Sequence, residues 1–280
     1  ADFADLSAAT PLMARIYPNG LADVNHFHAA GGLAYVIGEL LDAGLLHPDT
    51  KTVVGEGLAD YTREPRLDGD RITYADGPKG SLNDRILRPV SDPFQATGGV
   101  VELNGNLGRG VMKVSAVAPE RHVVEAPAAV FEDQAAVKAA FQAGDLNRDV
   151  VVVVRFQGPR ANGMPELHAL TPVLSVLQDR GHKVALVTDG RMSGASGKVP
   201  SAIHVSPEAV GGGVLGKLQD GDLIRVDATA GTLAVLTEGV VDRPSATPDL
   251  SGNAHGVGRE LFEIFRATAG PATAGAAVVV

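Results

Sequence analysis

The sequence predicts a mixed α/β fold, and two short apolar runs carry that prediction. Residues 150–154 are five consecutive valines, which is typical of a strand buried on both faces of a parallel sheet. Residues 184–187 form a second apolar run, bounded by polar residues and glycine. Between the runs, leucines at 167, 170, 174 and 177 recur at helical spacing before Gly181. We therefore expect a strand–helix–strand unit with parallel strands and a right-handed crossover.

The first 90 residues are predicted to be mostly helical. Thr10 and Pro11 suit the N-cap and the first position of a helix. Apolar residues at 33, 36, 37, 40 and 41 then form an amphipathic stripe that ends at Gly44, a residue suited to a helix C-terminus. Residues 60–97 lack apolar periodicity and predict an irregular connection, so we place a domain boundary near residue 90.

From Gly98 the pattern changes to short strands separated by turn residues, as in a small β-barrel or sandwich layer. The predicted strands are residues 100–103, 111–117, 122–125 and 128–131. A short helix over residues 134–142 should end at Gly144. Further along, a strand pair around Gly231 suits a hairpin, and residues 259–268 are predicted to form a last helix.

Two polar loops follow the apolar runs, over residues 155–166 and 188–198. Parallel strands would bring both loops to one edge of the sheet, where ligands bind in α/β proteins. Glu166 is expected in the first turn of a helix that begins at Pro165, where the helix dipole keeps a carboxylate ionised. Pro172 should kink or split that helix. Glu166 beside a glycine-rich, hydroxyl-bearing loop is half of a site for Mg²⁺; the alternative is an ordinary acidic residue at a helix start.

The bulk composition excludes several classes of protein. The net charge of −9 argues against nucleic-acid binding, which needs a basic face. No stretch approaches the roughly 20 apolar residues of a membrane span, and the N-terminus lacks the features of a secretory signal, so a cytoplasmic protein is expected. The sequence contains no cysteine, which excludes disulfides and any metal site held by thiolates of these residues.

Several common site motifs also fail. Gly197 and Lys198 do not make a phosphate loop, because position 192 is methionine and position 199 is valine. A nucleophile elbow at Ser193 would need glycine at position 191, which is arginine. His26 and His28 form a His-x-His pair, which alone supplies too few ligands for a metal.

Two long motifs nevertheless identify a family. Residues 188–209 read Thr-Asp-Gly-Arg-Met-Ser-Gly-Ala-Ser-Gly-Lys-Val-Pro-Ser-Ala-Ile-His-Val-Ser-Pro-Glu-Ala, and residues 157–168 read Gln-Gly-Pro-Arg-Ala-Asn-Gly-Met-Pro-Glu-Leu-His. Both resemble the dihydroxy-acid/6-phosphogluconate dehydratase family, most closely its 6-phosphogluconate dehydratase branch. The resemblance covers essentially the whole chain. It implies a C-terminal swivelling β-barrel-like β/β/α domain at residues 91–280, preceded by a mostly helical remnant of the family's N-terminal domain at residues 1–90.

The resemblance also implies a reaction. Enzymes of this family remove water from sugar acids, here 6-phospho-D-gluconate to 2-dehydro-3-deoxy-6-phosphogluconate in the Entner-Doudoroff pathway. Ser193 matches the serine that abstracts the C2 proton, and Glu166 matches a Mg²⁺ ligand. A nearby cation is needed before a serine can act as a base. The remaining expected substrate-binding residues are Asp189, Arg191, Gly194, Ser196 and Lys198.

The missing cysteines limit what the chain can do alone. The family uses an iron–sulfur cluster, expected as 4Fe–4S, whose ligands must lie outside this chain. We therefore expect the C-terminal half of an enzyme, inactive by itself, that needs the N-terminal domain and forms a homodimer. The alternatives are a dihydroxy-acid or aldonic-acid dehydratase of the same family, or a non-catalytic module that binds sugar acids.

Overall fold

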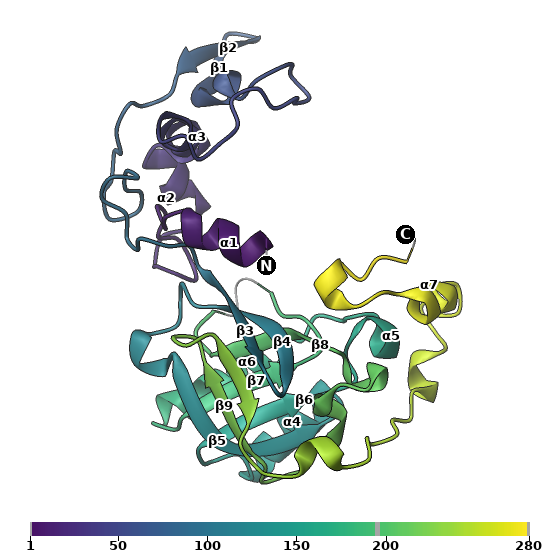
Figure 1. The fold of residues 1–280 in the computed structure, drawn as a ribbon. Helices are drawn as coiled ribbons and strands as arrows, with labels where there is room; N and C mark the ends of the chain where they lie inside the picture. Colours follow the sequence, from purple (N-terminus) through teal and green to yellow (C-terminus); the bar gives the residue numbers. More distant parts are fainter. Residues whose placement is uncertain (1, 194–196, 279–280) are drawn as a thin grey trace. The chain divides into compact units, whose positions relative to one another are not determined.

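The computed structural model describes residues 2–193 and 197–278 of the 280-residue chain. The chain divides into two compact units, residues 1–99 and residues 100–280, and each unit has its own apolar core. Their helices and strands make a mixed α/β protein, as predicted (Figure 1). No helix in this part of the chain combines the length and apolar content needed to cross a bilayer.

The first unit contains the helices α1 (Asp2–Ala9), α2 (Val24–Ala29) and α3 (Gly32–Asp42). The prediction of a helix that begins at Thr10 is wrong. Helix α1 ends at Ala9, and the Thr10 N–H donates to Leu6 O at 3.0 Å, as expected just after a helix end. The next residues are extended, since Leu12 pairs with Gln95 in an antiparallel bridge. That partner lies 83 positions away, so no local pattern could reveal it.

The prediction for α3 is confirmed. This helix covers the apolar stripe, and Gly44 follows its C-cap with a φ of +70°. Tyr35 packs in the core of the unit with Ala30, Ile86 and Leu87.

Residues 60–97 are not irregular throughout, which corrects the prediction. Strands β1 (Arg63–Asp68) and β2 (Arg71–Asp76) form an antiparallel hairpin. Its turn is closed by Gly69, whose φ of +59° suits glycine. The hairpin was missed because its strands are mostly exposed, and they lack the alternation of a half-buried strand.

The second unit is built on a closed barrel with the strand order β10-β3-β4-β8-β7-β6-β5-β9. The strands are β3 (Val100–Gly105), β4 (Gly108–Lys113), β5 (Val123–Phe131), β6 (Val150–Val154), β7 (Val184–Thr188), β8 (Ser201–Ser206), β9 (Leu223–Asp227) and β10 (Thr232–Val235). Strands β5 to β8 run parallel to their neighbours in the order β5-β6-β7-β8, which confirms the predicted parallel pair. The hairpin of β9 and β10 is also confirmed.

The remaining helices of the second unit are α4 (Gln134–Ala143), α5 (Pro159–Asn162), α6 (Leu170–Asp179) and α7 (Glu263–Thr268). Short 3₁₀ helices lie at Ala59–Thr62 in the first unit and at Pro119–Arg121, Ala209–Gly211, Val214–Lys217, Val240–Asp242, Ser251–Asn253 and Ala272–Ala274 in the second. Helix α4 matches its prediction, with Asp133 as N-cap and Gly144 left-handed at its C-terminus.

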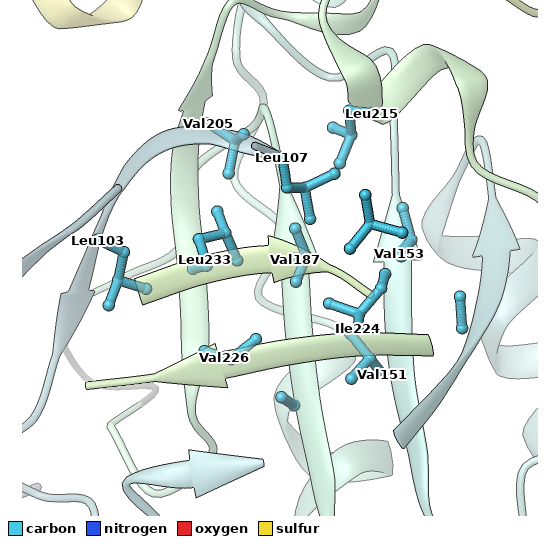
Figure 2. Close-up of a cluster of buried hydrophobic side chains, with 14 of the residues drawn as sticks. Leu103, Leu107, Val151, Val153, Val187, Val205, Leu215, Ile224, Val226 and Leu233 are labelled. Atoms are coloured by element: carbon cyan, nitrogen blue, oxygen red, sulfur yellow. The ribbon is translucent and has the colours of Figure 1, made fainter. Parts of the chain in front are cut away.

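Strands β6 and β7 are buried on both faces, as their composition predicts. Val151, Val153 and Val187 point into the barrel and pack with residues such as Ile224 and Leu233 (Figure 2). The alternate valines of β6 pack outward with the leucines of α6. Because successive side chains of a strand point to opposite faces, the single strand β6 contributes valines to two apolar cores.

Two details of this unit correct the predictions. Residues 122–125 and 128–131 are not separate strands but parts of the continuous strand β5. Pro127 lies where β5 changes its pairing from β9 to β6. Helix α6 begins at Leu170 rather than Pro165, so Pro172 lies in its first turn and causes no kink. The first turn tolerates proline because its N–H groups have no partner within the helix.

Candidate active site

The polar loops after β6 and β7 lie side by side, as predicted. Val154 is directly opposite Thr188 in the parallel pair, so both chains leave the barrel at one edge. The first loop contains the short helix α5 and leads to Glu166. The second loop begins at Asp189 and leads to Ser193.

Asp189 fastens these loops to each other from within. Its side chain is fully buried, and its carboxylate accepts the backbone N–H groups of Phe156 at 3.2 Å and Gln157 at 2.8 Å. The N–H of Ala209 donates to the same carboxylate at 3.0 Å. Burial raises the pKa of the Asp189 carboxyl, and the three N–H donors act against that shift. In this structure Asp189 therefore holds backbone in place beneath the loop surface.

Glu208 plays a similar part that the sequence prediction missed. Its nearly buried carboxylate accepts the N–H of Arg160 at 3.2 Å and that of Ala161 at 3.4 Å, at the start of α5. Burial raises the pKa of this carboxyl. Gly158 must be glycine for steric reasons, since a Cβ there would lie 2.8 Å from the Cβ of Glu208. The only sequence signal was a glutamate inside the family motif.

Glu166 and Arg191 are brought together by an isolated parallel bridge. Glu166 is therefore not in the first turn of a helix, which corrects the prediction that a helix dipole keeps it ionised. The Arg191 Nε donates to Met164 O at 2.9 Å, and its Nη1 lies 3.9 Å from the Glu166 Oε2. The Glu166 side chain is 34% exposed and that of Arg191 49%, so the pair is loose and open to solvent.

Gln134 supports this bridge from α4. Its Nε2 donates to the backbone oxygen of Glu166 at 3.3 Å, and its Oε1 accepts the N–H of Ala169 at 3.1 Å. The side chain spans the segment that precedes α6. The sequence pattern around Gln134 predicts only a short helix, because nothing local indicates this distant contact.

The other predicted site residues follow the bridge. Ser193 lies two positions after Arg191 and is half-buried. Lys198 is exposed near the start of β8. Gly194 and Ser196 lie outside the described residues. The structure thus places Glu166, Arg191 and Ser193 on one short stretch of the barrel edge.

His204 is a third residue near this edge that the sequence pattern does not reveal. Its backbone has a φ of +57°, and its N–H donates to Gly190 O at 2.9 Å, which ties β8 to the loop after β7. Burial lowers the pKa of His204, and the Arg191 charge lowers it further. A neutral imidazole is therefore favoured close to Arg191.

The described residues of this edge supply one ligand position for Mg²⁺. Among residues 2–193 and 197–278, no group of three or more His, Cys, Asp or Glu side chains could hold a metal. Mg²⁺ is nevertheless commonly held by one or two carboxylates together with water and substrate oxygens, and Glu166 is accessible for that. His26 instead takes part in the capping box of α2, in which the N-cap Asp23 accepts the His26 backbone N–H at 3.0 Å and the His26 ring accepts the Asp23 N–H. Without cysteine, the sequence offers no thiolate for an iron–sulfur cluster.

Comparisons with known proteins agree with these motifs. Residues 85–276 match the sequence model for the C-terminal part of dihydroxy-acid/6-phosphogluconate dehydratases, and residues 1–61 match that for the N-terminal part. The phosphogluconate dehydratase of Pseudomonas aeruginosa is 60% identical over 98% of this chain and 45% of its own length. That of Escherichia coli K12 is 55% identical over 99% of this chain and 46% of its own length.

A dihydroxy-acid dehydratase from Caldanaerobacter subterraneus is more distant, at 36% identity over 81% of this chain and 38% of its own length. The chain spans about half the length of the phosphogluconate dehydratases it matches. Together with the motifs at the barrel edge, the matches establish that the chain belongs to the dihydroxy-acid/6-phosphogluconate dehydratase family.

Proposed function

We propose that this chain is the C-terminal part of a 6-phosphogluconate dehydratase, a hydro-lyase that makes 2-dehydro-3-deoxy-6-phosphogluconate. The observation that carries the proposal is the bridge that holds Glu166 beside Arg191, which lies two positions before Ser193 in the sequence. High identity to proteins named phosphogluconate dehydratase supports the phosphorylated substrate. Lower identity to a dihydroxy-acid dehydratase supports the same choice.

In this proposal Ser193 accepts the proton from C2 of the sugar acid as the C3–O bond breaks. The leaving hydroxide takes up a proton and departs as water, and the enol left at C2 and C3 tautomerises to the 2-keto acid. When bound, Mg²⁺ supplies positive charge that lowers the pKa of an adjacent hydroxyl, and an iron–sulfur cluster supplies a Lewis acid for the leaving hydroxyl. Glu166 holds one position of the magnesium site. The guanidinium of Arg191 is half exposed, and it binds the substrate carboxylate.

The remaining predicted residues have supporting roles in the proposal. Gly194, Ser196 and Lys198, which lie between β7 and β8 in the sequence, contact the substrate. Asp189 serves the substrate by fixing the loop after β7, since its carboxylate is occupied by three backbone N–H groups. These bonds preserve the spacing between the two loops, and catalysis depends steeply on such spacing.

The cluster ligands do not come from these residues. Because the 280 residues include no cysteine, we propose that residues outside this chain hold the cluster and complete the magnesium site. Residues 1–90 then form the end of the family's N-terminal domain, and residues 91–280 form its swivelling C-terminal β/β/α domain. The intact enzyme is proposed to be a homodimer.

The proposal is tested by substrate comparison. The full-length protein, reconstituted anaerobically with iron, sulfide and Mg²⁺, should dehydrate 6-phosphogluconate faster than gluconate or a dihydroxy acid. A preference for either unphosphorylated acid would contradict the substrate assignment and favour another branch of the family. The 280-residue chain alone should bind no cluster and show no turnover, so iron, sulfide or dehydratase activity in it would contradict the division of the site.

A further inference from the structure

A cavity of about 520 Å³ adjoins the loop that carries Glu166 and lies outside the bridge between Glu166 and Arg191. One wall comes from α5 and from Gly163, Met164 and Pro165, the three residues immediately before Glu166. The other wall comes from the C-terminal segment around α7, which contacts α5 (Figure 1). The cavity therefore begins where the proposed catalytic loop ends.

Two arginines of the C-terminal segment line this cavity. Arg259 is held against α5, because its Nη1 donates to Asn162 Oδ1 at 3.0 Å and to Asn253 O at 3.3 Å. The Nη1 of Arg266 donates to Arg259 O at 3.2 Å. Both side chains are thus fixed by neutral partners. Within the part of the chain that the structure describes, neither guanidinium pairs with a carboxylate, and both bond through Nη1, which leaves Nε and Nη2 for a ligand.

This combination suits a phosphate monoester. Each guanidinium has one edge anchored and keeps further N–H donors in a planar fork, which matches two oxygens of a phosphate group. Apolar residues such as Phe262 and Phe265 line the same cavity beside the two guanidinium groups, and both phenylalanines are partly exposed, so a ligand can reach the arginines from solvent. A neutral or purely apolar ligand would leave the two charges unbalanced.

We propose that Arg259 and Arg266 bind the phosphate end of the substrate. The inference rests on the proposed function, which places the carboxylate end of the same molecule at Glu166 and Arg191. The two charged ends of 6-phosphogluconate lie at opposite ends of a six-carbon chain, so they require two separate anion sites. The segment around α7 is then the part of this chain that selects phosphorylated acids over unphosphorylated ones.

The test uses the full-length protein and the variants Arg259→Gln and Arg266→Gln, with Arg148→Gln as the control. Arg148 is an exposed arginine of the same unit, and its Nε donates to the backbone oxygen of Asp145. Turnover of 6-phosphogluconate and gluconate is measured for each protein, and binding of inorganic phosphate is measured by calorimetry. Inorganic phosphate is the probe that needs no turnover.

Each arginine variant should raise the KM for 6-phosphogluconate about tenfold or more, the value of one lost charge-assisted hydrogen bond. It should weaken phosphate binding similarly and leave gluconate kinetics unchanged, while Arg148→Gln matches the wild type. Equal effects on both acids, or no effect, would overturn the proposal. If the wild type bound phosphate but turned over neither acid, and both variants lost phosphate binding, the phosphate site would stand and the proposed function would fall.

Discussion

Replacement of Asp189 tests how the loops after β6 and β7 are joined. Alanine at this position leaves three buried N–H groups, those of Phe156, Gln157 and Ala209, without an acceptor. An unsatisfied buried donor costs about 1–3 kcal/mol, so the expected loss of unfolding free energy is about 3–9 kcal/mol. That loss is comparable with the whole stability of a domain, roughly 5–15 kcal/mol.

Asparagine separates hydrogen bonding from shape. Its single oxygen can stand where Oδ2 accepts from Phe156 and Ala209, but its amide nitrogen then faces the N–H of Gln157. Only one donor loses its acceptor, so Asp189→Asn should cost about 1–3 kcal/mol. Urea unfolding of the 280-residue chain, followed by circular dichroism, measures both changes. The exposed Asp145→Asn is the control. The account is refuted if all three variants are equally stable.

Three further predictions concern stability and pH. Gly158→Ala forces a Cβ against Glu208 and should lower the free energy of unfolding in urea by about 1–3 kcal/mol. The control Gly252→Ala places its Cβ in open space and should lower it by less than half as much. Equal losses in the two variants would contradict the close packing at Gly158. Pro172→Ala should change the unfolding free energy by less than about 1 kcal/mol, because Pro172 is in the first turn; a gain near 3 kcal/mol would indicate an interior proline. Burial lowers the pKa of His204 below its ordinary 6.5, so the unfolded chain binds more protons and stability falls as the pH drops below 6.5. Asparagine tolerates the φ of +57°, so His204→Asn should make the free energy of unfolding fall less steeply below pH 6.5. If urea unfolding gives the same pH dependence for both proteins, the prediction for His204 is contradicted.

The parts of the fold that sequence could predict are those that local pattern determines. The five valines of β6 predict a strand buried on both faces, and Asp133 and Gly144 mark the two ends of α4. Closure of the barrel, in contrast, could not be predicted from local sequence pattern. It depends on pairings such as Thr232 with Asn104, between residues 128 positions apart, and no local pattern encodes their contact.

The site shows the same limit. Parallel strands were enough to predict that the loops of Glu166 and Ser193 meet at one edge. The start of α6 was misplaced because the leucine spacing continues upstream of the helix, while Glu166 is held in a bridge by the distant residue Arg191. Glu208 and Gln134 were missed because their partners are backbone groups of remote segments. Such contacts exist only after the chain has folded.

The central claim is that Ser193 is the base at this barrel edge. Its most direct test is Ser193→Ala in the full-length, reconstituted protein, with 6-phosphogluconate as substrate. Turnover should be abolished while iron, sulfide and the visible absorption of the cluster match the wild type, because no cluster ligand is changed. Exchange of the C2 proton with solvent deuterium, followed by NMR, should stop as well. Retained turnover or retained exchange would remove Ser193 from the mechanism.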